Sequence, residues 1–258
     1  MPKIQIHTGH IYYEWLNEKS DSSEVLVFLH EALGSTAQWK DFPEKLCNLM
    51  GMRGLVYDRL GYGKSSEDET IRNSTYLEDF ALNEMPQVIS KLIPHNKIHI
   101  AGHSDGGSIA LIYASKFSKN IVSVSTMAAH VFVEDVTLNG IQPAIDAYKL
   151  GKLDGLKKYH GEKTEHLFYN WARTWLSSEY KNWNIEKYLK GITCPTLVIQ
   201  GENDQYGTEK QVESICSQVN GFSQKLMIPN CGHAPHLEEK ELVLLELCKF
   251  IKLFRTKI

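Results

Sequence analysis

The sequence predicts an α/β protein in which helices cover both faces of a mostly parallel β-sheet. Short, almost continuously apolar runs recur along the chain, which is typical of strands buried on both faces. Helix-type segments separate these runs, as parallel strands require. The clearest runs lie at 24–30, 53–58, 121–128 and 195–201. With 258 residues and 42% hydrophobic content, one α/β domain with an insertion accounts for the length better than two domains.

The N-terminal third is expected to begin with a hairpin. Residues 3–8 and 11–17 are predicted to form its strands, joined at Gly9 and His10. The apolar run E-V-L-V-F-L-H at 24–30 then predicts a buried strand. Three elements follow in order: a helix at 38–50, a strand at 53–58, and a helix at 76–93 that Pro86 is expected to kink.

A serine flanked by glycines interrupts the stretch from Lys97 to Ala114. The motif G-x-S-x-G is present as Gly102 to Gly106, with Ser104 at its centre, a β-type run before it and a helix-type run after it. This context predicts a sharp strand-to-helix turn, because Cβ atoms two residues to either side of the serine would collide across it. The Ser104 hydroxyl would then stand at a helix N-terminus, whose free N–H groups favour developing negative charge.

The pattern changes between Ala129 and Gly191. No strand is evident there, aromatic residues are dense and charged residues are interspersed, which predicts a helical insertion over the sheet. We therefore divide the chain into an α/β core of residues 1–128 and 192–258 and a helical cap of residues 129–191. The core is expected to resume with a strand at 195–201, a helix at 208–219, a strand at 225–228 and a closing amphipathic helix.

Composition and charge exclude several classes of partner. A net charge of −3 provides no basic surface for nucleic acid or an anionic membrane. The N-terminal residues M-P-K-I-Q-I-H lack the apolar segment of a signal peptide, and no apolar run approaches membrane-spanning length. Five widely spaced cysteines without C-x-x-C indicate reduced thiols. We expect a cytoplasmic monomer or homodimer that acts on a small molecule.

Two other motifs are incomplete. The pair His30-Glu31 suggests the zinc motif H-E-x-x-H, but that motif needs a histidine where Gly34 stands. The triplet G-K-S at 63–65 suggests a phosphate-binding loop, but that motif needs a glycine where Asp58 stands. The sequence therefore predicts neither a metal site nor a nucleotide site, and we expect no cofactor.

Ser104 needs a base that takes its proton, and we expect a histidine and a carboxylate on loops after later strands to supply this function. His233, in N-C-G-H-A-P-H, follows the last predicted strand. It is favoured over His236, which is expected to cap the next helix or face solvent. Asp204 follows the strand at 195–201 and is placed to accept the Nδ1–H of His233, which would fix its tautomer.

Other residues near these positions stay open as alternatives. Glu134 and Asp135 follow the preceding strand and are substitutes for Asp204, whereas Glu202 lies too near a strand end. Cys231 lies close to His233, but we interpret it as a small buried residue rather than the nucleophile.

Taken together, the motifs resemble the α/β-hydrolase superfamily over essentially the whole chain. They are D-R-L-G-Y-G-K-S at 58–65, the elbow at 102–106, G-E-N-D at 201–204 and G-H at 232–233. The blocks G-H-S-D-G-G and C-P-T-L-V-I-Q-G-E-N-D resemble the biphenyl-hydrolase-like branch, which includes valacyclovir hydrolase, an amino-acid-ester hydrolase. The resemblance implies an α/β-hydrolase fold with a mostly parallel eight-stranded sheet, helices on both faces and a helical cap. It also implies that Ser104 is the nucleophile, His233 the base and Asp204 the carboxylate that orients the base. The backbone N–H groups of Ala32 and Asp105 would form the oxyanion hole.

The implied reaction is hydrolysis of a carboxylic ester, with an aminoacyl ester as one candidate, through an acyl-enzyme intermediate and without a cofactor. Hydrolysis of a carbon–carbon bond or of a lactone uses the same three residues and is the main enzymatic alternative. A hydrolase-fold binding protein or receptor is the non-enzymatic one, because fold alone does not establish function.

Asp105 is an unusual neighbour for a serine that generates an oxyanion, and two interpretations stay open. A carboxylate in the first turn of a helix is favoured by the helix dipole and can point away from the substrate. Alternatively, Asp105 lies in the pocket with Glu31 nearby and pairs with a cationic group, such as the α-ammonium of an aminoacyl ester.

Overall fold

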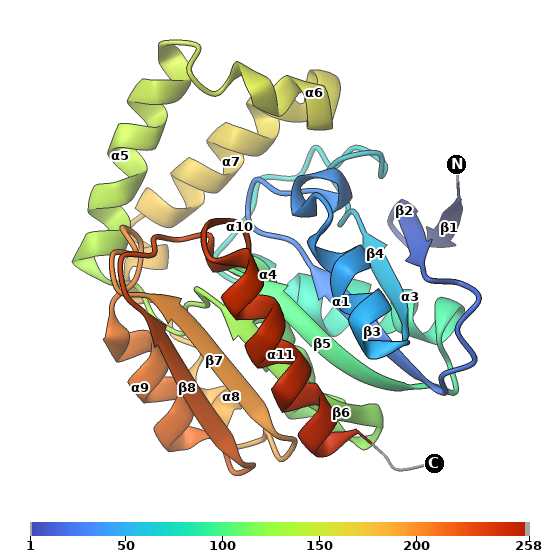
Figure 1. Ribbon diagram of the computed structural model, residues 1–258. Coiled ribbons are helices and arrows are strands. Elements are labelled where there is room, and N and C mark those ends of the chain that lie inside the picture. The colour runs from blue at the N-terminus through green and yellow to red at the C-terminus, as the bar shows by residue number, and fades with distance from the viewer. Residues whose placement is uncertain (1, 256–258) are drawn as a thin grey trace.

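An eight-stranded sheet runs through the middle of the protein, as seen in a computed structural model that describes residues 2–255 (Figure 1). The spatial order is β1-β2-β4-β3-β5-β6-β7-β8, with β2 antiparallel to both of its neighbours and the remaining pairs parallel. This confirms the predicted fold class. The strands are β1 Lys3–Ile6, β2 Gly9–Leu16, β3 Glu24–Leu29, β4 Arg53–Tyr57, β5 Lys97–His103, β6 Ile121–Met127, β7 Thr196–Gly201 and β8 Ser223–Ile228.

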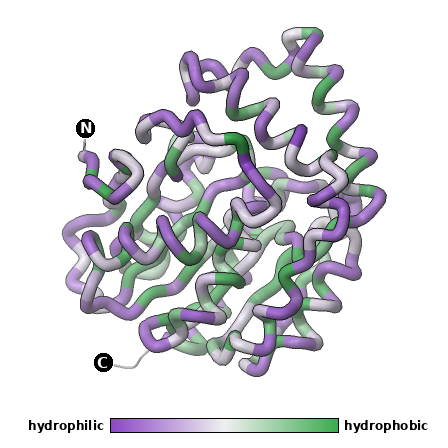
Figure 2. The backbone as a smooth tube through the Cα atoms, turned by 180° about the vertical axis from the view of Figure 1, so that it is seen from behind, coloured by the Kyte–Doolittle hydropathy of each residue, from purple (hydrophilic) through white to green (hydrophobic). Residues whose placement is uncertain are grey.

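Helices cover both faces of the sheet and bury separate apolar clusters. On one face α1 (Phe42–Met50) packs beside α11 (Lys240–Phe254), and the short helix α10 (Pro235–Glu238) precedes α11. The other face carries α2 (Tyr76–Asp79), α3 (Met85–Leu92), α4 (Asp105–Lys116) and α9 (Glu209–Gln218). Figure 2 shows the hydrophobic segments gathered along the central strands, with hydrophilic segments along the outer helices.

The segment after β6 is helical, as the dense aromatic residues predict. Its helices are α5 (Asp135–Lys149), α6 (Lys157–His160), α7 (Thr164–Leu176) and α8 (Glu186–Leu189). Figure 1 shows α5, α6 and α7 standing together beyond one end of the sheet. They lie at the end where the parallel strands finish, which places them over the loops that carry the candidate site.

The first hairpin turns at a different place from the predicted one. Ile6 pairs with Gly9, so the turn consists of His7 and Thr8 rather than Gly9 and His10. Gly9 lies beside this turn with φ 155°, a backbone conformation that L side chains rarely adopt. It is also closely packed, because a Cβ there would lie 3.0 Å from atoms of Leu60 and Ser66.

Two predicted helices are less regular than their apolar spacing suggested. The helix expected at 38–50 is a 3₁₀ turn, Thr36–Trp39, followed by α1, with Lys40 in a positive-φ conformation between them. The helix expected at 76–93 contains a π-helical turn, Phe80–Glu84, immediately before α3. Pro86 follows that turn, and because it has no N–H to donate, it favours a break in the regular hydrogen-bond ladder at this point. Within residues 2–255, no helix is long and apolar enough to cross a membrane.

Candidate active site

Ser104 occupies the sharp turn between β5 and α4. Its backbone has φ 52° and ψ −119°, a conformation that a non-glycine residue adopts only under strain. The flanking glycines make the turn sterically feasible: a Cβ on Gly106 would lie 2.0 Å from the carbonyl oxygen of Leu29, and one on Gly102 would lie 2.3 Å from that of Gly106. The predicted strand-to-helix elbow is therefore present.

A substitution at this elbow tests how tightly it is packed. We expect Gly106→Ala to lower the free energy of unfolding by about 1–3 kcal/mol, because the added methyl meets a backbone oxygen that cannot move aside. Urea unfolding followed by circular dichroism measures the effect. Gly155→Ala is the matched control, since nothing lies within 4 Å of the added Cβ there. A Gly106→Ala protein with the unfolding midpoint of the wild type would contradict the steric argument.

The structure brings the three predicted polar residues into one hydrogen-bonded chain. The Nε2 atom of His233 lies 3.0 Å from Oγ of Ser104, and its Nδ1 lies 2.9 Å from each carboxylate oxygen of Asp204. Asp204 also accepts hydrogen bonds from Gln200 Nε2 at 2.6 Å and from the Tyr206 amide at 2.8 Å. This geometry matches a nucleophile, a base and an orienting carboxylate.

Electrostatics in this chain favour an ionised Asp204 beside a basic His233. Burial alone would raise the pKa of Asp204, but the hydrogen bond and charge of His233 outweigh it and lower that pKa below its ordinary value. Burial alone would lower the pKa of His233, but its hydrogen bond to Asp204 and the Asp204 charge, with Glu31 and Asp105, raise it above the ordinary value. Each partner therefore stabilises the charged form of the other.

The alternative residues occupy other positions. Glu134 accepts hydrogen bonds from Thr208 and Gln211 at the start of α9, while Asp135 begins α5 and Glu202 is exposed. Burial raises the pKa of the Cys231 thiol to about 11, which keeps it protonated and a weak nucleophile at neutral pH.

The prediction that His236 caps a helix or faces solvent is wrong. Its side chain is only 3% exposed, and its ring centroid lies 4.6 Å from that of Trp39 and 4.6 Å from that of His103. The short helix α10 carries it inward against these rings, a tertiary arrangement that the sequence pattern does not reveal.

Ala32 and Asp105, the predicted oxyanion donors, both line the cavity that contains Ser104. Ala32 belongs to the loop after β3, and Asp105 is the first residue of α4. Neither backbone N–H has an acceptor among residues 2–255. This is expected of an amide at the start of a helix, and it leaves both N–H groups free to bind a substrate oxygen.

The cavity around Ser104 has a volume of about 180 Å³ and a mixed lining. Its charged and polar lining residues include Glu31, Asp105 and His130. Its apolar lining comes mainly from the segment after β6: Ile141, Leu153, Leu156, Trp171 and Trp175. A small organic molecule with one polar end suits such a site.

Asp105 is one of the residues that line the cavity, and its side chain is buried. It is 2% exposed, and its Oδ2 accepts a hydrogen bond of 2.9 Å from the Tyr76 hydroxyl, which in turn accepts one of 2.9 Å from Trp175 Nε1. Burial raises the pKa of Asp105, and the charge of Arg59 and the Tyr76 hydrogen bond offset only part of that effect. The charge of Arg72 acts in the same direction as that of Arg59.

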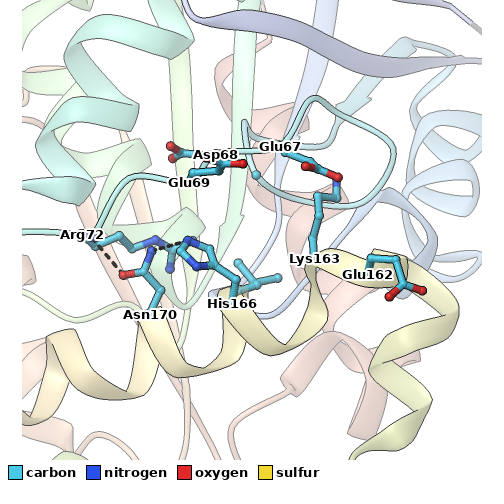
Figure 3. A pocket seen from close by; sticks show the side chains of 10 residues that line it. Glu67, Asp68, Glu69, Arg72, Glu162, Lys163, His166 and Asn170 are labelled. Atoms are coloured by element: carbon cyan, nitrogen blue, oxygen red, sulfur yellow. Dashed lines mark hydrogen bonds between the residues drawn. The ribbon is translucent and has the colours of Figure 1, made fainter.

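A second cavity, of about 410 Å³, lies between the loop after β4 and α7 (Figure 3). Glu67, Asp68 and Glu69 approach it from the loop, and His166 and Asn170 from α7. Neither serine nor cysteine is among the residues that line it, so it offers no nucleophile comparable to Ser104. Elsewhere in the described part of the chain, no group of His, Cys, Asp and Glu is placed to hold a metal ion.

Two functional candidates were missed in the sequence. His103 Nε2 donates a hydrogen bond of 2.7 Å to the carbonyl oxygen of His233, and its Nδ1 lies 3.5 Å from Glu31. His130 lines the Ser104 cavity just beyond β6. Its place after a parallel strand would have pointed to the same edge of the sheet as Asp204, because the carboxyl ends of such strands converge.

Comparison with known proteins identifies similar chains across nearly the full length. A model of the alpha/beta hydrolase family matches residues 26–244. The proline iminopeptidase of Saccharolobus solfataricus is 25% identical, over 93% of this chain and 88% of that protein. The serine hydrolase BPHL of Mus musculus is 25% identical, over 91% of this chain and 80% of that protein. Among solved structures, MGS-M2, an alpha/beta hydrolase enzyme from a Medee basin deep-sea metagenome library, has a TM-score of 0.77 at 19% identity, covering 100% of this chain and 98% of that chain.

Proposed function

The chain belongs to the alpha/beta hydrolase family, and from that membership we propose that it hydrolyses small carboxylic esters, preferably aminoacyl esters, through an acyl-enzyme on Ser104. The observation that carries the proposal is the hydrogen-bonded chain from Ser104 through His233 to Asp204, in a cavity that also contains the Asp105 carboxylate. The match to BPHL is in line with the motif resemblance to biphenyl-hydrolase-like proteins, which is confirmed.

The proposed mechanism begins when Ser104 Oγ attacks the ester carbonyl carbon and gives its proton to His233 Nε2. Asp204 stabilises the imidazolium that forms, and the N–H groups of Ala32 and Asp105 stabilise the oxyanion. The tetrahedral intermediate collapses, and the alcohol leaves with the proton from His233. Water then attacks the acyl-enzyme with His233 again as base, which releases the acid and restores Ser104.

The proposed aminoacyl preference is based on the Asp105 carboxylate. A buried carboxylate with a raised pKa is less stable ionised than it would be in water, so an ammonium group beside Asp105 gains a favourable ion pair. Glu31, about one-third exposed, adds a second carboxylate to the same cavity. The name of the relative, proline iminopeptidase, denotes a substrate built on an amino acid, which supports this class.

We also propose that residues 129–191 act as a cap that determines which side chains fit. Trp171 and Trp175 of α7 and Ile141 of α5 supply much of the apolar lining of the cavity. In this arrangement the core supplies the reacting groups, and the cap supplies His130 and the apolar surface that selects among substrates.

A charge-removing substitution tests the aminoacyl preference. We expect the wild type to favour a free-amine alanyl ester over its N-acetyl analogue in kcat/KM, and Asp105→Asn to reduce that preference about 10- to 100-fold, the range for a charge-assisted hydrogen bond. Asparagine keeps an oxygen for the Tyr76 hydroxyl, so the wall stays packed.

Asp135→Asn is the matched control, because Asp135 also begins a helix but is exposed and lies outside the cavity. Steady-state kinetics with a common leaving group give the ratios. If Asp105→Asn leaves the wild-type preference intact, Asp105 is a helix-start residue and does not bind the amine.

A further inference from the structure

Hydrogen bonds fix both the backbone and the ring of His130. Its backbone N–H donates to Ser108 Oγ at 3.1 Å, and its carbonyl oxygen accepts from the same hydroxyl at 2.6 Å. Its ring Nε2 lies 3.0 Å from the carbonyl oxygen of Tyr206. Because a carbonyl oxygen can only accept, Nε2 carries the hydrogen, and Nδ1 of the neutral ring presents a lone pair.

That Nδ1 lone pair has no partner among the described residues, although the side chain is only 3% exposed. Leaving a buried acceptor unpaired is costly, and groups of this kind in native structures commonly have a functional reason. Burial and the nearby His233 lower the pKa of His130, which keeps the ring neutral and Nδ1 available as an acceptor. The residue lines the same cavity as Ser104.

His130 and Asp105 belong to one continuous wall of this cavity. The ring centroid of His130 lies 5.4 Å from that of Trp175, at an angle of 71°. The indole N–H of Trp175 holds the Tyr76 hydroxyl, which donates to Asp105. Asp105, Trp175 and His130 all line the cavity, and these contacts hold the three residues in a fixed order.

We propose that Nδ1 of His130 accepts a hydrogen bond from the α-ammonium of the substrate, so that the site recognises N–H donors in addition to positive charge. This inference rests on the proposed aminoacyl-ester function and specifies its amine subsite. An α-ammonium has three N–H donors, and one carboxylate whose Oδ2 already accepts from Tyr76 leaves at least one of them to another acceptor. A cation without N–H groups would satisfy Asp105 but not His130.

The experiment compares three alanyl esters with the same leaving group: the free ammonium, the N,N,N-trimethylammonium and the N-acetyl form. The first two share a charge and differ in N–H donors, whereas the third has lost the charge. We expect His130→Gln to lower the kcat/KM ratio of ammonium to trimethylammonium about 10-fold relative to the wild type. Glutamine can still donate to the Tyr206 carbonyl, but it has no acceptor at the position of Nδ1. The steric effect of the methyl groups cancels in this comparison.

A second pair of variants keeps the inference testable if His130→Gln does not fold. His130→Asn places an oxygen near the position of Nδ1, and His130→Leu has nearly the same shape without an acceptor. Both lose the Tyr206 contact, so we expect both to be slower with every ester. Only His130→Leu should also lose the preference for the ammonium over the trimethylammonium ester.

The outcomes separate this inference from the function on which it rests. If the wild type shows no preference for the ammonium ester over the N-acetyl ester, the aminoacyl proposal fails, and the subsite fails with it. If the wild type has that preference but His130→Gln, or His130→Leu, slows all three esters by the same factor, only the His130 inference is overturned. His130 would then be a residue that positions the Tyr206 loop.

Discussion

Ser104→Ala is expected to lower kcat for ester hydrolysis about 10⁴-fold or more while the protein stays folded. The reason is that the nucleophile, base and carboxylate act as a unit, so without Oγ the base and the carboxylate have no nucleophile to activate. What remains is the stabilisation from the oxyanion donors and binding alone. Steady-state kinetics on a p-nitrophenyl ester measure the loss, and circular dichroism checks the fold.

Covalent labelling separates an enzyme from a hydrolase-fold binding protein. A fluorophosphonate should add to the wild type and to Ser118→Ala, an exposed serine just beyond α4, but not to Ser104→Ala, as seen by intact-protein mass. A wild type that is not labelled would favour the receptor alternative. A Ser104→Ala protein that keeps more than about a tenth of the activity would remove Ser104 from the mechanism, because the unit behaviour does not allow so small a loss.

The fold and the reacting side chains could be predicted because their determinants are local. Apolar runs of strand length and helical spacing predict the element order. The clash that requires Gly102 is also local, with Gly106 four residues on, whereas Gly106 itself faces Leu29 at the end of β3. Asp204 and His233 were found because each directly follows a parallel strand, and such strand ends meet at one edge of the sheet.

The residues that were missed depend on contacts between distant segments. Gly9 lies beside the turn rather than in it, and the approach of Leu60 and Ser66 adds a packing constraint to its positive φ. His236 is buried by rings of Trp39 and His103 that lie far away in sequence. His130 is a candidate because its Nδ1 lone pair has no partner among the described residues. This lone pair can be assigned only from the structure, because the Tyr206 carbonyl fixes the tautomer. No periodicity or spacing in the sequence encodes these arrangements.

Asp204→Asn is expected to lower kcat about 10⁴-fold, nearly as much as losing the nucleophile. The asparagine side chain can donate an N–H toward His233 Nδ1, which would place the remaining proton on Nε2, where a lone pair is needed to accept the Ser104 proton. Glu202→Gln is the matched control, because Glu202 is an exposed carboxylate two residues earlier in the same loop. It should keep activity within a few-fold.

The pH profile of the same variant distinguishes orientation from simple misfolding. The base must be neutral, so wild-type kcat/KM rises with pH through the pKa of His233, which Asp204 helps to hold above its ordinary value. Without the Asp204 charge the burial of His233 is less opposed, its pKa falls, and the residual activity of Asp204→Asn should reach its plateau at lower pH than the wild type. A partly unfolded variant would instead keep the wild-type profile at reduced amplitude, because its activity would come from the remaining native molecules. A low rate with an unshifted acidic limb would therefore argue against an ionised Asp204 as the partner of His233.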